Sequence, residues 1–208
     1  MQTRKSLSLA FATKDLQKMY LAIVKSKIDL PASFQVNLPI GKPEDSKIRL
    51  KLSVNFKFGK EAMTNFFVLS SHKDYYLLAC FPLTGRTNQI RVHLSSVGAP
   101  IVGDKMYHSD ENTFLEYFED GLTENVLRKI EFKRQILHNA VLSISKAQLE
   151  ISCPISKDIQ EGFSFWEKLS LSKNSLSLSK KEGILNAFQF YKDKSPEFVF
   201  QSESQLYL

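Results

Sequence analysis

Thr84 to Tyr107, which reads TGRTNQIRVHLSSVGAPIVGDKMY, is the most informative stretch of the chain. The apolar run Tyr75 to Leu83 before it is typical of a strand, and Gly85 permits a tight turn after that strand. From Arg86 to Val97 apolar residues recur at helical spacing, and Gly98 is placed to end the helix. A cluster of arginine, amide and imidazole groups in two helical turns can bind phosphate or hold a buried carboxylate. A solvated basic helix face is the alternative.

The rest of the pattern predicts an α+β fold, with a mixed, largely antiparallel sheet and helices packed on it. Short apolar runs bounded by turn residues predict strands over residues 20–24, 64–69, 75–83, 141–145 and 148–153. Arg49 to Phe58 alternates apolar and polar residues, which predicts a half-buried strand. Proline and glycine punctuate residues 29–46, which are expected to be loop or edge structure. Helices are expected over residues 7–18, within 108–132 and over 159–169.

A change of composition divides the chain after residue 169. Residues 1–169 are expected to form one domain. Residues 170–208 begin with the Ser- and Lys-rich stretch Ser170 to Glu182, which is typical of a linker, and continue as a C-terminal extension. The apolar residues of that extension either dock on the domain or remain free.

Composition narrows the class of protein. Among 208 residues, 43% are hydrophobic and 24% are charged, which excludes wholesale disorder and fibrous proteins. The net charge of +6 favours an anionic partner, with nucleic acid first. Six basic residues between Lys42 and Lys60 either meet phosphates or form an ordinary soluble surface.

Location and metal content follow from the same composition. No apolar stretch is long enough to predict a membrane span. Cys80 and Cys153 suit a reducing compartment, and they show no metal-ligand spacing with histidine, so no metal site is predicted. The expected location is therefore the cytoplasm. The basic, acid-free stretch Gln2 to Lys14 leaves a mitochondrial transit peptide as the alternative.

Thr84 to Leu94 resembles the signature T-G-R-T-H-Q-I-R-V-H-L of the RluA-type pseudouridine synthases, and differs from it only at Asn88. Gly98 to Tyr107 resembles the G-x-P-I-x-G-D-x-x-Y run that follows the signature in this family. Weaker matches occur in the family's order at residues 18–22, 59–64 and 137–154. The resemblance therefore spans about residues 8–168 and implies the fold of a pseudouridine synthase.

The resemblance implies an isomerase that converts uridine in ribosomal or transfer RNA to pseudouridine, with no cofactor and as a monomer. An aspartate attacks a flipped-out nucleotide, the glycosidic bond breaks, and the rotated base forms a carbon–carbon bond through C5. Tyr20 matches the tyrosine that stacks on the uracil and takes the C5 proton. Arg91 matches the arginine that pairs with the catalytic aspartate. The signature also implies four substrate-binding residues: Arg86, Asn88, Gln89 and His93.

The family's nucleophile segment is missing from these 208 residues. In the family the catalytic aspartate lies in an H-R-L-D-x-x-T-S-G segment, whereas no aspartate here follows His-Arg-Leu. Asp104 belongs to the G-D-x-x-Y run and is expected to brace the turn after the helix. The chain is therefore interpreted as an N-terminally truncated catalytic domain whose nucleophile is assigned to no residue. Three explanations stay open: a longer natural protein, a decayed relic, or a shortened protein kept for RNA binding.

Overall fold

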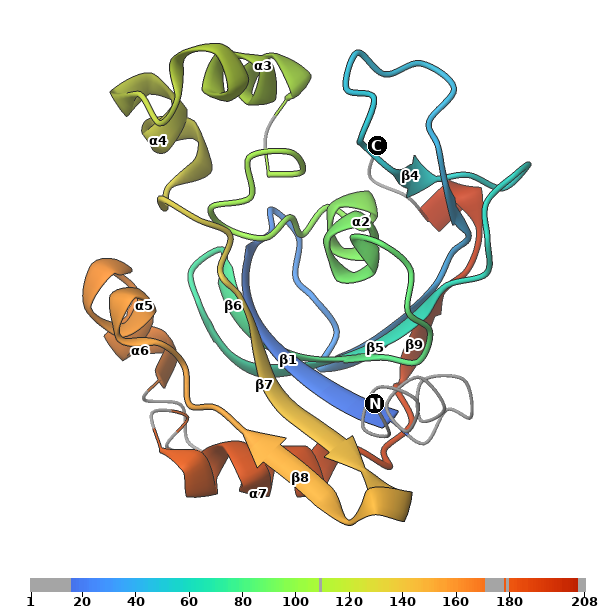
Figure 1. Cartoon of the computed structure of the whole chain (residues 1–208), viewed down its shortest axis with the longest axis vertical. Helices are drawn as coiled ribbons and strands as arrows, with labels where there is room; N and C mark the ends of the chain where they lie inside the picture. The colour runs from blue at the N-terminus through green and yellow to red at the C-terminus, as the bar shows by residue number, and fades with distance from the viewer. Residues whose placement is uncertain (1–15, 109, 171–177, 179, 206–208) are drawn as a thin grey trace, which may run out of the picture.

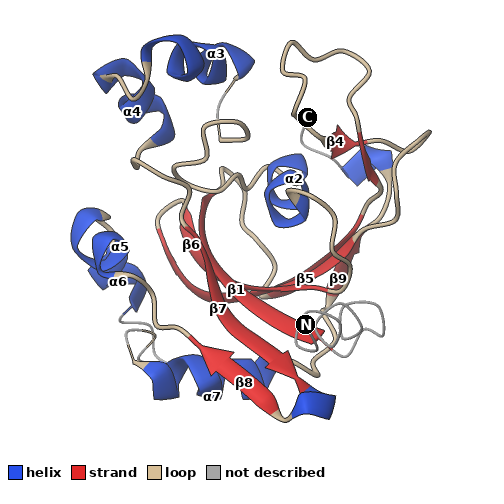
Figure 2. Ribbon diagram, in the orientation of Figure 1, coloured by secondary structure: helices blue, strands red, loops and turns tan. Residues whose placement is uncertain are grey.

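The computed structural model describes residues 16–108, 110–170, 178 and 180–205. A seven-stranded sheet in the order β8-β7-β1-β6-β5-β2-β9 curves around one helix, α2, as Figures 1 and 2 show. Every neighbouring pair in this sheet is antiparallel except β2 and β9, which run parallel. The predicted α+β class, with a largely antiparallel sheet, is confirmed.

The elements of the described chain have the following bounds. The strands of the main sheet are β1 (Leu16–Lys25), β2 (Ser33–Asn37), β5 (Met63–His72), β6 (Tyr75–Pro82), β7 (Leu137–Ile144), β8 (Leu149–Ser152) and β9 (Phe198–Phe200). A separate two-stranded sheet pairs β3 (Ile40–Gly41) with β4 (Ser53–Val54). The helices are α2 (Gln89–Ser96), α3 (Glu111–Asp120), α4 (Glu124–Ile130), α5 (Lys157–Gly162), α6 (Trp166–Ser170) and α7 (Lys181–Tyr191), with short 3₁₀ turns at Ser145–Ala147 and Glu203–Gln205.

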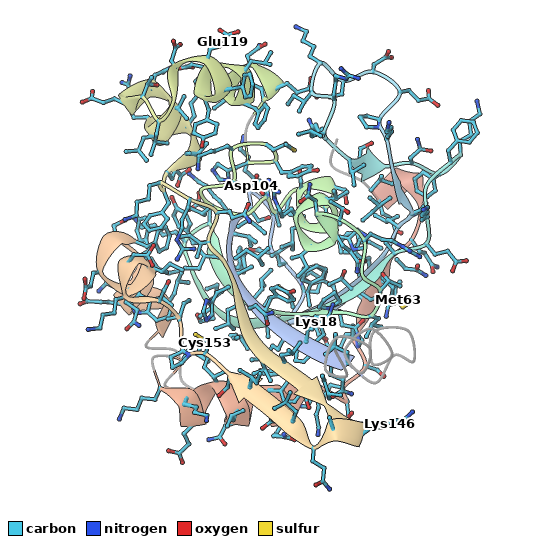
Figure 3. All side chains as sticks on the ribbon, viewed as in Figure 1. Lys18, Met63, Asp104, Glu119, Lys146 and Cys153 are labelled. Carbon is cyan, nitrogen blue, oxygen red and sulfur yellow. The ribbon has the colours of Figure 1, made fainter. Side chains whose placement is uncertain are left out.

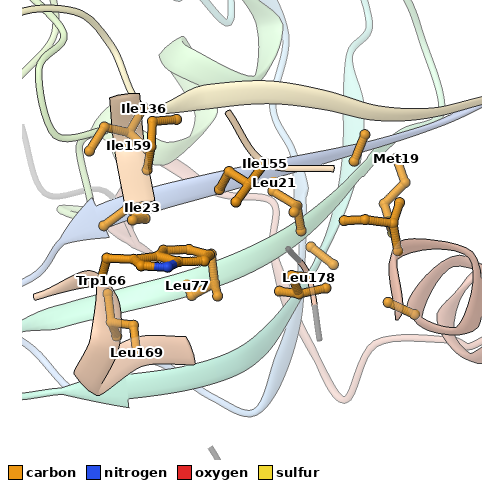
Figure 4. Packing of buried hydrophobic residues seen from close by; sticks show 14 of the residues in the cluster. Met19, Leu21, Ile23, Leu77, Ile136, Ile155, Ile159, Trp166, Leu169 and Leu178 are labelled. Atoms are coloured by element: carbon orange, nitrogen blue, oxygen red, sulfur yellow. The ribbon is translucent and has the colours of Figure 1, made fainter. Parts of the chain in front are cut away.

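Both faces of the central strands are buried, and β1 shows how the sequence achieves this. Successive side chains of a strand point to opposite faces. Met19, Leu21 and Ile23 accordingly pack in a core with residues of α5, α6 and α7, part of which Figure 4 shows. Ala22 and Val24 pack on the opposite face with residues of α2. The central strands are therefore apolar on both sides, and β1 is held between two layers.

Four of the predicted strands form two antiparallel hairpins. β5 and β6 join through a tight turn at Lys73, whose φ of 55° is left-handed. β7 and β8 join through the 3₁₀ turn at Ser145–Ala147. The predicted polar stretch 108–132 contains the two helices α3 and α4. The predicted helix over 159–169 is two short helices, α5 and α6.

Three predictions differ from the structure. Residues 49–58 do not form a half-buried strand: only Ser53–Val54 is extended, and Leu50 is 80% exposed. The predicted apolar face is covered only in part: Leu52 and Val54 pack against a small core that includes Val92 of α2, whereas Leu50, Phe56 and Phe58 are exposed. Residues 29–46 include β2, which lies inside the sheet between β5 and β9 rather than in a loop or at an edge. The predicted helix 7–18 lies outside the described residues except for Leu16 to Lys18, which belong to β1.

Residues after 177 contribute to both cores. Leu178, Ile184 and Phe188 are buried behind the sheet. Phe200 of β9 is buried on the other side, where its ring meets Phe34 edge-on at 5.8 Å. The domain boundary after residue 169 stays a prediction. None of the helices in the described ranges has the length and apolar character that a bilayer crossing needs.

A polar cluster ties the end of α4 to the sheet. Glu131, which follows α4 with a left-handed φ of 69°, accepts hydrogen bonds from Lys25 Nζ at 2.8 Å and from the Tyr75 hydroxyl. His108 Nε2 lies 3.5 Å from the same carboxylate. Burial alone would raise the pKa of Glu131, but hydrogen bonds from His108, Lys25 and Tyr75 outweigh it and lower the pKa to about 2. The carboxylate is therefore charged throughout the neutral range.

Candidate functional site

A cavity of about 230 Å³ opens between β1, the end of β6 and the start of α2. Figure 3 labels Lys18 on β1, which lines the cavity, and Asp104 in the loop after α2. The lining residues are Lys18, Tyr20, Pro82, Thr84, Gly85, Arg86, Asn88, Gln89, Ile90, Arg91, Gln135 and Leu137. Three of them are basic and none is acidic, so the cavity favours an anionic or electron-rich ligand.

Gln89 shapes the loop that leads into α2. Its side-chain oxygen accepts hydrogen bonds from Thr84 Oγ1 at 2.7 Å and from the backbone N–H of Arg86 at 3.0 Å. Its side-chain nitrogen donates to the carbonyl of Met63 and to Thr64 Oγ1, both at 2.9 Å. Gln89 is therefore fully engaged within the protein. It braces the wall of the cavity.

The helix begins three residues later than the sequence predicts. Asn88, at φ 57° and ψ 17°, is left-handed and precedes the first helical residue, Gln89. Arg86 therefore lies in the loop, where its Nε donates to the carbonyl of Glu61 at 2.8 Å. Asparagine adopts left-handed backbone more readily than most residues. The local turn thus accounts for the later start.

A buried ion pair fixes Arg91. Its Nε and Nη2 donate to the two carboxylate oxygens of Asp104 at 2.6 and 2.7 Å, and its Nη1 donates to Asn88 Oδ1 at 2.8 Å. Burial alone would lower the pKa of Arg91, but Asp104 outweighs it and raises the pKa. Asp104 also accepts the backbone N–H groups of Met106 and Tyr107, so it braces the turn after α2 as expected.

Arg91 is therefore a permanent cation in a fixed position at the cavity. A guanidinium has five N–H donors. Three are used by Asp104 and Asn88. The bidentate geometry also shows that Asp104 is already committed to Arg91 and to the backbone, which leaves Asp104 poorly suited to act as a nucleophile.

Tyr20 and Lys18 reach the cavity from β1. Residues two apart on a strand point to the same face, and both side chains line the cavity. Burial raises the pKa of Tyr20, so its hydroxyl is protonated at neutral pH. Burial lowers the pKa of Lys18. Lys18 was not among the predicted site residues, although its two-residue spacing from Tyr20 could have indicated it.

His93 is the one predicted site residue that does not line the cavity. Its imidazole is completely buried, with Nδ1 3.0 Å from Thr64 Oγ1 and Nε2 3.0 Å from the carbonyl of Leu38. Burial lowers its pKa to about 4, against the effect of the Leu38 carbonyl, so the ring is neutral at pH 7. His93 and Gln89 both bind Thr64, and Gln89 also lines the cavity with Asn88 and Arg91. The substrate-binding role of His93 stays a prediction, and its burial does not favour it.

The cysteines and acids of the described residues do not assemble into a metal site. Cys80 is buried, which raises the pKa of its thiol, and Cys153 is exposed; both are free. Within the described ranges, no three His, Cys, Asp or Glu side chains gather closely enough to hold a metal ion.

The fold resembles that of solved pseudouridylate synthase domains. The structure resembles that of human RNA pseudouridylate synthase domain containing 1 with a TM-score of 0.63, covering 92% of this chain and 72% of that one. At 20% sequence identity, this likeness defines the fold alone.

Sequence comparison relates the chain to one family of proteins. Residues 1–96 match the profile of a family described as RNA pseudouridylate synthase. Ribosomal large subunit pseudouridine synthase D of Borreliella burgdorferi is 38% identical over 105 residues, which are 50% of this chain and 31% of that protein. The protein of the same name from Xanthomonas campestris is 30% identical over 166 residues, which are 77% of this chain and 47% of that protein. The chain is a relative of the RNA pseudouridine synthases, as its signature predicts, and it spans about half the length or less of these relatives.

Proposed function

We propose that this chain supplies the tyrosine and arginine part of the active site of an RluA-type pseudouridine synthase. Its substrate would be uridine in ribosomal or transfer RNA, and it would act as a monomer in the cytoplasm. The observation that carries the proposal is the cavity: it gathers Tyr20 and Arg91 with Lys18 and Arg86. These are an aromatic ring that can stack on a base and three cations that can meet an anion.

In the proposed reaction, a uridine leaves its stack and enters the cavity, where the ring of Tyr20 lies against the base. The burial that raises the pKa of Tyr20 keeps its hydroxyl protonated before the reaction. Transfer of the C5 proton to this oxygen therefore requires that the hydroxyl first give its own proton to solvent, so that the phenolate oxygen accepts the C5 proton. Arg91 uses its remaining N–H groups to orient the attacking carboxylate, while Asp104 and Asn88 hold it in place.

We assign the attacking carboxylate to a His-Arg-Leu-Asp segment outside residues 1–208. No lining residue is acidic, and no aspartate of this sequence follows His-Arg-Leu. The same two observations favour a second candidate function: binding of RNA without chemistry. The two functions differ in whether the natural protein carries that segment.

Release of tritium from ribosomal RNA labelled at uridine C5 tests the proposal, because pseudouridine formation frees the C5 hydrogen. The protein is purified from its own cells, and its intact mass and N-terminal peptide are determined. We expect a product that carries the missing segment to release tritium, and Arg91→Ala in it to abolish release. Arg134→Ala is the matched control, because Arg134 also pairs with an aspartate, Asp158, but does not line the cavity.

The outcomes separate the candidates. Tritium release by residues 1–208 alone would place the nucleophile within this chain and refute its assignment elsewhere. A natural product that begins at Met1, binds RNA and releases no tritium would establish the non-catalytic function. Full activity of Arg91→Ala would remove the role of Arg91.

A further inference from the structure

Two exposed phenylalanines lie on a surface turn whose residues do not line the cavity. Phe58 is 73% exposed and Phe56 is 46% exposed, in the segment where the sequence predicted a half-buried strand. Single exposed apolar residues are ordinary, but two aromatic side chains on one turn are less so. We call residues 55–60 the aromatic turn.

The aromatic turn is held by specific contacts. Asn55 Oδ1 accepts the backbone N–H groups of Lys57 at 3.0 Å and Phe58 at 2.7 Å, and Asn55 Nδ2 donates to the carbonyl of Lys42 at 2.8 Å. The N–H of Gly59 donates to the carbonyl of Asn55 at 2.9 Å. A Cβ at Gly59 would lie 2.2 Å from that carbonyl oxygen, so only glycine fits. The protein therefore holds the two rings outward by fixed geometry.

The surroundings of the rings are basic. Residues 42–60 contain six lysines or arginines and two acids. Lys57 Nζ lies 5.0 Å from the centre of the Phe58 ring. Aromatic rings next to lysines are the combination that binds single-stranded nucleic acid, since bases stack on the rings and phosphates meet the cations. Charge complementarity thus points to RNA as the occupant.

The aromatic turn is also connected to the cavity. Lys60 pairs with Ile40 through two backbone hydrogen bonds of 2.8 and 2.9 Å, which fixes the end of the turn. The next residue, Glu61, accepts the hydrogen bond from Arg86, and Arg86 lines the cavity. The backbone at the end of the turn is therefore joined through Glu61 to Arg86 at the cavity.

We propose that Phe56 and Phe58 form a stacking platform for unpaired nucleotides that flank the nucleotide in the cavity. The inference rests on the proposed function in one respect, namely that the substrate is RNA. It adds a second contact site, outside the cavity, that binds RNA through stacking.

Fluorescence anisotropy of the full chain with a labelled single-stranded oligouridine of about 12 nucleotides tests the platform, since this length is within the usual site size. We expect the double variant Phe56→Ala and Phe58→Ala to bind at least about tenfold more weakly than the natural chain, because each stacked base contributes to affinity. Phe58→Trp, which keeps a ring, is expected to retain binding. Phe118→Ala is the matched control, because Phe118 is 77% exposed on α3.

A salt titration separates stacking from charge. Replacing Lys57 and Lys60 with glutamine is expected to flatten the dependence of affinity on salt, whereas the phenylalanine variants keep the natural slope. Circular dichroism confirms that each variant is folded.

Three results would overturn the inference. One is equal binding by the natural chain and the double alanine variant. Another is equal loss from Phe118→Ala and from the double variant. The third is that binding to vesicles of phosphatidylcholine and phosphatidylserine depends on Phe56 and Phe58 whereas binding to RNA does not, which would make the turn a membrane contact. If the natural chain itself binds no RNA, the proposed function is refuted. The three results above refute only the stacking platform, so the two failures can be told apart.

Discussion

Replacing Asp104 with asparagine is expected to lower the free energy of unfolding by about 3–5 kcal/mol. The Asp104 side chain is completely buried and receives two N–H groups of Arg91 at 2.6 and 2.7 Å. Asparagine has nearly the same shape but no charge, and its amide nitrogen would face a donor. Arg91 would then remain largely buried as a cation without its counter-charge.

The magnitude follows from the contacts. A hydrogen bond to a charged group contributes about 1.5–3 kcal/mol, and two such bonds join this pair. Arg91→Met is expected to cost a similar amount, because it leaves a buried carboxylate without its cation. The double variant leaves neither charge alone, so its cost should fall short of the sum by about 2–3 kcal/mol.

Urea unfolding at neutral pH, followed by circular dichroism, measures these free energies. The pair Arg134 and Asp158 is the matched control: its two hydrogen bonds are 2.8 and 2.9 Å long, but its side chains are 39% and 32% exposed. Asp158→Asn should therefore cost no more than about 1 kcal/mol. Equal costs at Asp104 and Asp158, or additive costs in the Arg91 and Asp104 double variant, would refute the reasoning from burial.

Three further predictions follow from other contacts. The pKa of Glu131 is lowered to about 2, so its contribution to stability is lost as the pH falls from about 4.5 to 2. In acid unfolding curves, Glu131→Gln should remove about 1–2 kcal/mol of this pH dependence, a value reduced to allow for solvent screening. His93 should titrate near pH 4 in proton NMR, with stability lost as the pH falls from about 6.5 to 4 because the unfolded chain binds that proton more tightly; titration near 6.5 would contradict its burial. Gly103→Ala should cost about 3 kcal/mol or more in thermal unfolding, because φ is 79° and a Cβ would lie 1.9 Å from the carbonyl of Arg134. Gly121→Ala, at φ 78° with open space around it, should cost about 1 kcal/mol, and equal costs at the two glycines would contradict the steric argument.

The sequence predicts those elements whose local pattern and packing agree. Residues 64–83 have long apolar runs around a polar turn, and both faces of β5 and β6 are buried. The same kind of pattern misleads at residues 49–58. Alternation records which residues are apolar but not whether another layer of the fold covers them, and here Leu52 and Val54 are covered but Leu50, Phe56 and Phe58 are not. The parallel pairing of β9 with β2 could not be predicted locally either, because it joins distant segments.

The candidate site was predicted from motif positions, and the structure shows which of its residues line one cavity. Tyr20 and Arg91 lie in one cavity, which their motifs alone imply. His93 lies two residues from Arg91 on α2, and residues so spaced on a helix do not face the same side. Helical spacing could therefore have separated the two. The contacts of Asp104 with Arg91 and two backbone groups depend on the chain's return after the helix, which no local pattern shows.

The pairing of β2 with β9 can form only late in synthesis of the chain, because β9 is made long after β2. Phe34 and Phe198 are register partners about 160 residues apart. At about 5–20 residues per second, the ribosome needs roughly 10–30 s to deliver β9 after β2. During that interval the outer edge of β2 lacks its neighbour, and the ring of Phe34 has Phe66 beside it but not Phe200. Nascent chains on one polysome therefore carry open β2 edges close to one another until β9 has been synthesised.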